Sequence, residues 1–287
     1  MQKIKNIIIK KCIDNKITSR ELDFLIYISH YQDSTGRVLG VYYRDVCAAL
    51  SISIQTFYDV KASLIKKGII SVSKNSEIDW DILIEDNDFS MENYHDGYIN
   101  TDSSVFYTKE FGQLKAGAKL MLMDLMRLTY SNRGRFIIKA DNLYKKYMEL
   151  FRVTKRVVRK YLSSIKKFFS ITLSEFKYTI FPLAAIKERK NNHDDEIYNK
   201  KAIETLCRRN KIKGAKAKQI KDTAALISQY RAIAMLGDKN IIDAMEGALK
   251  GSLEAINRYL SPKEKYRREL RPALVHKLLR EQIELYC

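Results

Sequence analysis

Apolar side chains along residues 17–84 follow first a helical and then a strand period. Three segments repeat apolar positions every three or four residues, which predicts helices over 17–31, 42–50 and 54–68. Thr18 and Glu21 have the spacing of a capping box at the first helix start, and Gly68 suits the end of the third helix. The segments predicted as short strands are 34–40, 69–73 and 79–84, the last two forming a hairpin around the polar tip 74–78.

The same order of elements returns in residues 116–183. Helices are predicted over 116–130, 139–150 and 154–168, with a strand after the first helix and a hairpin around Ser174–Phe176. Tyr31 and the run Gly36–Leu39 match Tyr130 and Gly134–Ile137, and a fixed offset of 101 relates Phe57, Val60 and Leu64 to Val158, Tyr161 and Ile165. This internal duplication predicts two tandem winged-helix domains.

The remaining residues predict a linker and a helical domain. Residues 85–115 are acidic and rich in turn formers, and within them 98–107 has the character of a strand. Helices are expected over 195–211, 217–236, 239–260 and 262–286, the last with Ser261, Pro262 and Glu264 as its start. The fold class is therefore mainly α with small β-hairpins, divided into 1–84 (first winged helix), 85–115 (structured acidic linker), 116–183 (second winged helix) and 184–287 (helical C-terminal domain).

Charge is distributed unevenly over these parts. The whole chain has a net charge of +18, of which residues 1–115 contribute −2, residues 116–183 contribute +11 and residues 184–287 contribute +9. A strongly basic module favours polyanionic partners through Coulomb attraction and counterion release. The second winged helix is therefore the part expected to bind nucleic acid.

The third helix of the second repeat concentrates this charge on one face. On a helical wheel, Val158, Tyr161, Leu162, Ile165 and Phe168 fall on one side of the helix. The opposite side carries cations and a serine, and no acid interrupts them. A solvated surface and a membrane-surface patch are the alternatives, but the apolar face is needed for the domain core, and uncompensated cations four residues apart repel each other.

The second helix of a helix-turn-helix enters the major groove of DNA, so the cationic face predicts a DNA reader. Arginine can pair with guanine in two hydrogen bonds, and lysine can contact a base or a phosphate. Cations near the helix start are expected at bases or nearby phosphates, and later ones at phosphates. The predicted DNA-binding residues are Lys155, Arg156, Arg159, Lys160, Ser163, Lys166 and Lys167 of the helix, with Lys177 of the hairpin and Arg133 and Arg135 of the turn.

The equivalent helix of the first repeat has a nearly neutral outer face. Gln55 and Tyr58 suit base contacts, but Asp59 opposes phosphate. This domain is expected either to support a homodimer or to bind DNA weakly. The C-terminal part has a second cation-rich stretch, Cys207–Lys221, which suits phosphate contacts and a solvated surface equally well.

Catalytic and metal-binding patterns are missing from the sequence. His30, His95, His193 and His276 are scattered, and no phosphate-binding loop or zinc motif occurs. The acids of Asn192–Glu196 suit a helix start better than a metal. We therefore expect no enzyme activity, no cofactor and no metal.

The cysteines are also unpatterned. Cys12, Cys47, Cys207 and Cys287 form no CxxC pair and are expected to be reduced thiols, with Cys47 in the core. The start of the chain has an apolar run too short for a signal peptide, and no segment is long enough to span a bilayer. A soluble cytoplasmic protein that does not interact with membranes is expected.

The duplicated pattern over residues 17–183 resembles the tandem winged-helix initiators of plasmid replication and, equally, winged-helix transcription regulators. In such initiators the first domain tends to dimerise and the second holds the main recognition helix, which is similar to the charge division seen here. The helical C-terminal domain departs from the initiator pattern. The leading interpretation is a sequence-specific double-stranded DNA-binding transcription regulator; a plasmid or phage replication initiator and a protein–protein interaction module are the alternatives.

Overall fold

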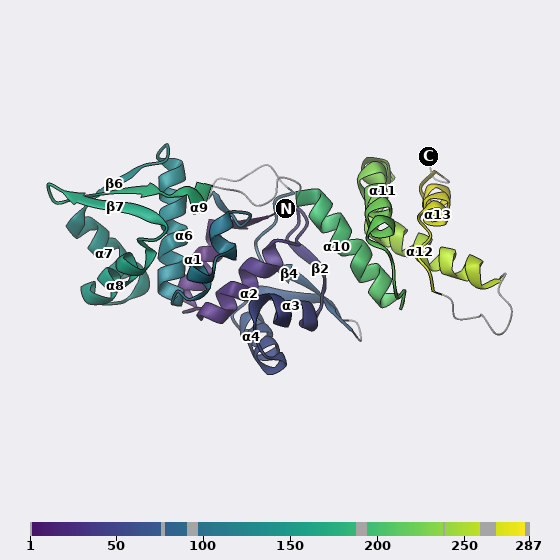
Figure 1. Ribbon diagram of the computed structural model, residues 1–287, viewed down its shortest axis with the longest axis horizontal. Coiled ribbons are helices and arrows are strands. Elements are labelled where there is room, and N and C mark those ends of the chain that lie inside the picture. The colour runs from purple at the N-terminus through teal and green to yellow at the C-terminus, as the bar shows by residue number, and fades with distance from the viewer. Residues whose placement is uncertain are drawn as a thin grey trace. The chain divides into compact units, whose positions relative to one another are not determined.

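A computed structural model describes residues 2–75, 78–90, 97–187, 194–237, 239–258 and 268–284 (Figure 1). The chain divides into two compact units: unit 1 consists of Met1–Ser73 and Ile82–Asn192, and unit 2 consists of Lys74–Asp81 and His193–Cys287. The protein is mainly helical with small antiparallel sheets, as the sequence predicted.

The first repeat, which begins at α2 (Ser19–Ser29), is formed in its described residues by three helices and a three-stranded sheet. Thr18 caps the first of these helices: its side chain accepts from the Glu21 N–H, and the Glu21 carboxylate accepts from the Thr18 N–H. The strands are hydrogen-bonded in the order β2–β4–β3. In chain order the elements of this first repeat are α2 (Ser19–Ser29), β2 (Arg37–Val41), α3 (Tyr43–Leu50), α4 (Ile54–Lys66), β3 (Ile70–Asn75) and β4 (Trp80–Ile84).

The second half of unit 1 has the same sequence of elements. Its strands pair in the corresponding order, β6–β8–β7, with Ile180 of the central strand opposite Phe136 on one side and Ile171 on the other. The elements of this second repeat are α6 (Ala116–Ser131), β6 (Phe136–Lys139), α7 (Ala140–Phe151), α8 (Lys155–Ile165), β7 (Phe169–Ser174) and β8 (Lys177–Pro182).

The duplication extends to the backbone between the second and third helix of each repeat. Ser51 and Arg152, which are 101 positions apart, both end their helices in the left-handed region with φ of 52°. The next helix begins after Ser53 in one repeat and after Thr154 in the other, again at the offset of 101. This turn therefore has one geometry in both repeats.

The buried side chains largely follow the expected correspondence. Phe57, Val60 and Leu64 are buried in α4, and Val158 and Ile165 are buried in α8. Tyr161, the expected counterpart of Val60, is only half-buried, and Leu162 takes the core position instead.

Additional elements complete unit 1. Lys3–Lys5 (β1) pairs antiparallel with Tyr98–Asn100 (β5), and α1 (Asn6–Asp14) follows β1. The short elements η1 (Ser104–Tyr107), α5 (Lys109–Gly112) and α9 (Ala184–Lys187) flank the second repeat in sequence. The expected strand over 98–107 is therefore a three-residue strand followed by a 3₁₀ turn, and α1 was not predicted.

The described residues of unit 2 form the helices α10 (Asp194–Arg209), α11 (Ala217–Leu236), α12 (Ile241–Arg258) and α13 (Pro272–Glu284). Arg209 donates to the buried carboxylates of Asp79 and Asp81, at 2.8 and 2.6 Å, so the outer part of the β3–β4 hairpin is held within unit 2. Tyr230 of α11 and His276 of α13 are hydrogen-bonded at 2.7 Å.

The expected last helix, over 262–286, needs correction, and several other expectations concern residues outside the described ranges. A continuous helix over 262–286 is wrong, because residues 268–271 are not helical and α13 starts at Pro272. Proline disfavours a helical residue before it, which explains a start at this point. The predicted start at Ser261, Pro262 and Glu264, as well as His95, His193, Cys287 and residues 192–193 of the acidic run, lie outside the described residues.

Cys47 is half-buried rather than a core residue. It belongs to α3, whose buried side chain is that of the preceding residue, Val46. Cys12 and Cys207 are buried, and burial raises the pKa of the Cys12 thiol to about 12 and that of Cys207 to about 11. These two thiols are therefore neutral core groups.

Candidate nucleic-acid interface

Helix α8 is amphipathic, and its apolar side fixes how it lies on unit 1. Val158, Leu162 and Ile165 are buried. Tyr161 reaches toward Gly117 at the start of α6, where a Cβ would lie 2.6 Å from the tyrosine ring. The cations on the other side of the helix are consequently turned to solvent.

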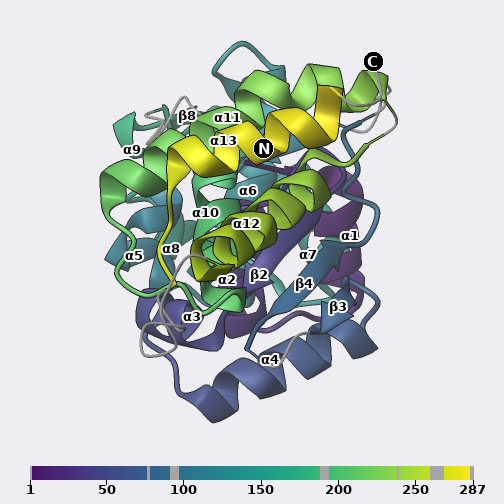
Figure 2. The ribbon, with the colours of Figure 1, turned by 90° about the vertical axis from the view of Figure 1, so that its right-hand side faces the viewer.

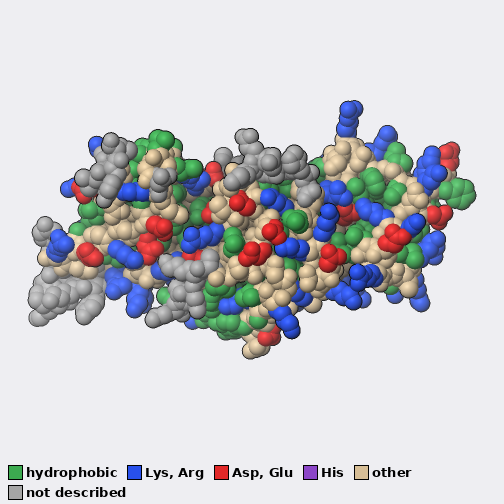
Figure 3. All heavy atoms as spheres, turned by 180° about the vertical axis from the view of Figure 1, so that it is seen from behind, with side chains coloured by type: hydrophobic (Ala, Val, Ile, Leu, Met, Phe, Trp, Pro, Cys, Tyr) green, Lys and Arg blue, Asp and Glu red, His purple; other side chains and the backbone are tan. Residues whose placement is uncertain are grey.

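The structure places all ten predicted residues on the surface of the second repeat. Figure 3 shows Lys and Arg side chains gathered on the right of the view, where this repeat lies. All ten predicted side chains are exposed: Arg133, Arg135, Lys155, Arg156, Arg159, Lys160, Ser163, Lys166, Lys167 and Lys177.

Part of this set faces the β7–β8 hairpin across a hollow of about 380 Å³. Arg159 and Ser163 of α8, with Lys166 directly after the helix, line one side. Leu173 and Tyr178 of the hairpin line the other. Cationic, hydroxyl and aromatic groups therefore converge beside the helix.

Tyr144 and Tyr178 were missed by the sequence reasoning. Their hydroxyls are 2.8 Å apart, and the Arg159 guanidinium and the Lys155 ammonium lie 5.6 and 4.7 Å from the centre of the Tyr144 ring. Such cation–π contacts restrict the two long side chains and aim them before any ligand arrives. The strand alternation around Tyr178 was visible in the sequence, but its partner on α7 was not.

Burial, with the hydrogen bond to Tyr144, raises the pKa of Tyr178 to about 12. The phenol is therefore neutral at ordinary pH and can donate a hydrogen bond. A neutral donor beside two cations suits a phosphate oxygen or a base acceptor.

The predicted turn residues do not join the hairpin tip. Register pairs Lys139 with Lys177 at the tip end of the sheet, while Phe136 pairs with Ile180 at the other end. Arg133 and Arg135 precede Phe136, so they lie at the end of β6 away from Lys177. Lys139, which is exposed and opposite Lys177, is a tip cation that the sequence reasoning overlooked.

Acidic groups near α8 are few. Asp141 lies 3.7 Å from the Lys155 ammonium, and both side chains are exposed, so this ion pair contributes little. α8 itself contains no acid. The outer face of α8 therefore keeps an excess of positive charge.

The equivalent helix of the first repeat has a different surface. Figure 2 shows α4 at the outer edge of this repeat, at the bottom of the view and below α2 and α3. Gln55 donates to Asp59 at 2.8 Å, and three large apolar side chains, Ile54, Tyr58 and Ile65, are more than a third exposed. α4 thus lacks the cationic face of α8.

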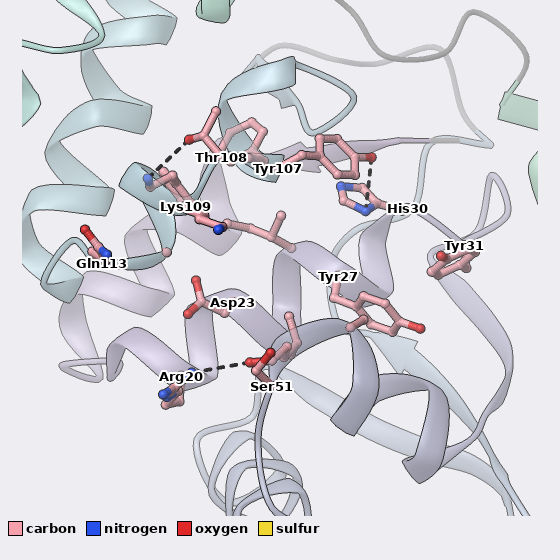
Figure 4. A pocket seen from close by; sticks show the side chains of 16 residues that line it. Arg20, Asp23, Tyr27, His30, Tyr31, Ser51, Tyr107, Thr108, Lys109 and Gln113 are labelled. Atoms are coloured by element: carbon pink, nitrogen blue, oxygen red, sulfur yellow. Dashed lines mark hydrogen bonds between the residues drawn. The ribbon is translucent and has the colours of Figure 1, made fainter.

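A larger pocket of about 560 Å³ lies in unit 1 between α2, the end of α3 and residues 106–113 (Figure 4). His30 stacks on Tyr107, and its Nε2–H donates to the Thr101 carbonyl at 2.9 Å. Its Nδ1 lies 3.3 Å from the Tyr107 hydroxyl. These contacts hold the imidazole ring in place at the edge of the pocket.

Within the described residues, no group of three or more His, Cys, Asp or Glu side chains is arranged to hold a metal ion. In the same part of the chain, no helix has the length and apolar character required to cross a bilayer. The chain matches no family model, no curated protein and no solved structure.

Proposed function

We propose that the chain binds double-stranded DNA through its second repeat, with α8 in the major groove. The order of helices and strands, with the first strand of each repeat hydrogen-bonded to the last, supports the assignment of both repeats as winged-helix domains. The third helix of such a domain is the helix-turn-helix element that reads base edges.

The observation that carries the proposal is the exposed face of α8. Arg156, Arg159 and Lys160 lie within its first six residues, all exposed, and the helix contains no acid. Cations near a helix N-terminus oppose the helix dipole, and cations three or four residues apart repel each other. A polyanion bound on this face removes both penalties.

A matched pair of triple variants tests this site. Arg156→Ala/Arg159→Ala/Lys160→Ala is compared with Lys10→Ala/Lys109→Ala/Lys115→Ala, which removes three exposed cations elsewhere in unit 1. Binding to duplex DNA is measured by fluorescence anisotropy over a series of salt concentrations. The α8 variant is expected to lose affinity, with a plot of log K against log salt shallower by about two units or more.

The control variant is expected to keep most of the wild-type affinity and slope. Equal losses in the two variants would mean that net charge, and not the α8 face, determines binding. Unchanged binding by the α8 variant would show that the assigned site is wrong. A wild-type protein that binds only other proteins would favour the interaction module instead.

We further propose that the bound DNA is a specific site and that the protein regulates transcription. The contrast between cationic α8 and nearly neutral α4 also suits a replication initiator, in which one domain binds DNA and the other forms the dimer. Selection of binding sites from the host's own DNA separates these functions. A short motif upstream of genes supports the regulator, clustered repeats beside the protein's own gene support the initiator, and recovery of DNA without a motif contradicts specific recognition.

A further inference from the structure

The turn between β7 and β8 is strained. Only Glu175 and Phe176 separate the paired residues Ser174 and Lys177, and their φ values are 47° and 61°. A two-residue hairpin with positive φ at both positions favours Asn-Gly or Gly-Gly, because a Cβ is crowded in this region. Glutamate and phenylalanine are therefore costly choices for the stability of this turn.

The turn is nevertheless held in place. The Phe176 carbonyl accepts a hydrogen bond of 2.8 Å from the N–H of Ala140, the first residue of α7. A strained backbone conformation persists only where surrounding contacts hold it, and such conformations are found most often at functional sites. The backbone of the tip is thus anchored, which gives its side chains defined directions.

The Phe176 side chain extends into solvent. It is 88% exposed, the highest fraction among the large apolar side chains of the described residues. An aromatic ring in this position contributes no core packing that would offset the strain of the turn. The stability of the fold therefore does not explain a phenylalanine at this position.

Two cations lie next to the turn that carries Phe176. Lys139 and Lys177 are directly opposite each other at the tip end of the sheet, and both are exposed. Like charges in this position destabilise a strand pair, and the one acid of the turn, Glu175, offsets only part of the charge. An exposed apolar ring on a turn next to two lysines suits a ligand with stacked bases between two rows of phosphates.

We propose that Phe176 is an apolar wedge that stacks against or enters a base step in the minor groove of bound DNA, with Lys139 and Lys177 on the flanking phosphates. The inference rests on the proposed function, with α8 in the adjacent major groove. A six-residue hairpin is about 20 Å long, and the next minor groove is roughly half a helical turn, about 17 Å, away. The narrow minor groove admits a phenyl ring, and apolar side chains used there unstack bases.

Substitutions at the tip distinguish stacking from charge. Phe176→Ala is compared with Lys177→Ala and with Leu236→Ala, which truncates an apolar side chain of unit 2 that is 86% exposed. A fluorescein-labelled random-sequence duplex of about 30 base pairs is the probe, titrated at several salt concentrations. Phe176→Ala is expected to weaken binding about tenfold without changing the salt slope, because no ion pair is lost. Lys177→Ala is expected to lower the slope by about 0.9, and Leu236→Ala should change neither quantity.

A tryptophan reports the contact directly. In Phe176→Trp, stacking on bases should quench the emission of the new indole and protect it from acrylamide when the same duplex is added. The wild-type protein, which has one tryptophan, supplies the background signal. Phe176→Gly should bind DNA as weakly as Phe176→Ala yet melt at a higher temperature, because glycine relieves the turn.

The outcomes separate this inference from the proposed function. If the wild-type protein binds the duplex and Phe176→Ala binds equally well, with unchanged tryptophan emission in Phe176→Trp, the wedge is wrong and the α8 interface stands. A lower salt slope in Phe176→Ala would also overturn it, because the loss would then come from displaced charges. Failure of the wild-type protein to bind any duplex would overturn both.

Discussion

Tyr161 of α8 lies so close to Gly117 of α6 that a Cβ on Gly117 would be 2.6 Å from Cε2, Cζ and Oη of the tyrosine. Carbon atoms in van der Waals contact are about 3.5–4.0 Å apart, so only glycine permits this approach. The contact determines how deeply α8 sits on α6. It therefore also determines how far the cations of α8 project.

We expect Gly117→Ala to disturb α8. Alanine favours a helix more than glycine does, so a gain of about 1 kcal/mol would follow from propensity alone. The collision with the ring should reverse this gain and lower the free energy of unfolding by about 1–3 kcal/mol. Chemical denaturation measures the change, and DNA titration should show weaker binding.

Gly112→Ala is the matched control, because a Cβ at Gly112 meets no atom within 4 Å. This substitution should leave DNA binding unchanged and should keep the gain in stability from helix propensity, at most about 1 kcal/mol. If Gly117→Ala is as stable as wild type, Tyr161 moves without penalty and the proposed dependence of α8 on Gly117 is wrong.

The ion pair between Lys119 of α6 and Asp23 of α2 links the two repeats. Their charged atoms are 2.5 Å apart, and the Lys119 side chain is fully buried. Burial lowers the pKa of Lys119 and raises that of Asp23, although each faces an opposite charge. Desolvation therefore outweighs attraction, and the pair contributes more to the register of the repeats than to stability.

Removing one partner should be costly. Lys119→Met leaves the Asp23 carboxylate without its cation and is expected to lower the free energy of unfolding by about 3–5 kcal/mol. The double variant Lys119→Met/Asp23→Leu should recover most of this loss, because no charge then stays buried. A double-mutant cycle by denaturation checks this, and additive losses would contradict the argument.

Stability should fall in acid because two buried carboxylates prefer to be ionised. Burial raises the pKa of Asp124, but Lys146 and Arg127 outweigh it, so the pKa lies below its ordinary 3.8. Burial likewise raises the pKa of Glu21, but hydrogen bonds from Lys67, Ser63 and Thr18 bring it below 4.5. Their stabilisation is complete above about pH 4.5 and is lost as the pH falls through the folded-state pKa values.

Asp124→Asn should reduce this pH dependence. It weakens the contacts to Lys146 and to the buried Tyr147 hydroxyl, so a loss of about 2 kcal/mol at pH 7 is expected. Denaturation at several pH values should show a shallower acid limb than in wild type. Asp141→Asn, at a side chain that is 95% exposed, should leave the limb unchanged; identical limbs in all three proteins would refute the assignment.

Local periodicity in the sequence was enough to predict most helices. α11 has the predicted bounds, Ala217–Leu236, and the apolar stripe of α8 is buried at Val158, Leu162 and Ile165. The capping box at Thr18 was confirmed as well. These features depend on residues three or four positions apart, which a single sequence displays directly.

Features that need distant partners were not predictable. β1 is a three-residue strand that exists only because Lys3–Lys5 meets Tyr98–Asn100. The pairing of Tyr144 with Tyr178, and the opposition of Lys139 and Lys177, depend on the register of β6 against β8. The strained turn at Phe176 could not be predicted from the sequence either, because glutamate and phenylalanine are not residues typical of a turn with positive φ.

Each repeat has a residue in the left-handed conformation at the same position, which leads to the same prediction for both. Ser51 and Arg152 both have φ of 52°, a conformation in which a Cβ is crowded and glycine is relaxed. Ser51→Gly and Arg152→Gly should each raise the free energy of unfolding by about 0.5–1 kcal/mol. Ala62→Gly, on the exposed side of α4, should instead lower it by about 1 kcal/mol. Thermal denaturation of the three variants tests this prediction. If all three substitutions are destabilising, positions 51 and 152 do not share the turn geometry of a duplicated domain.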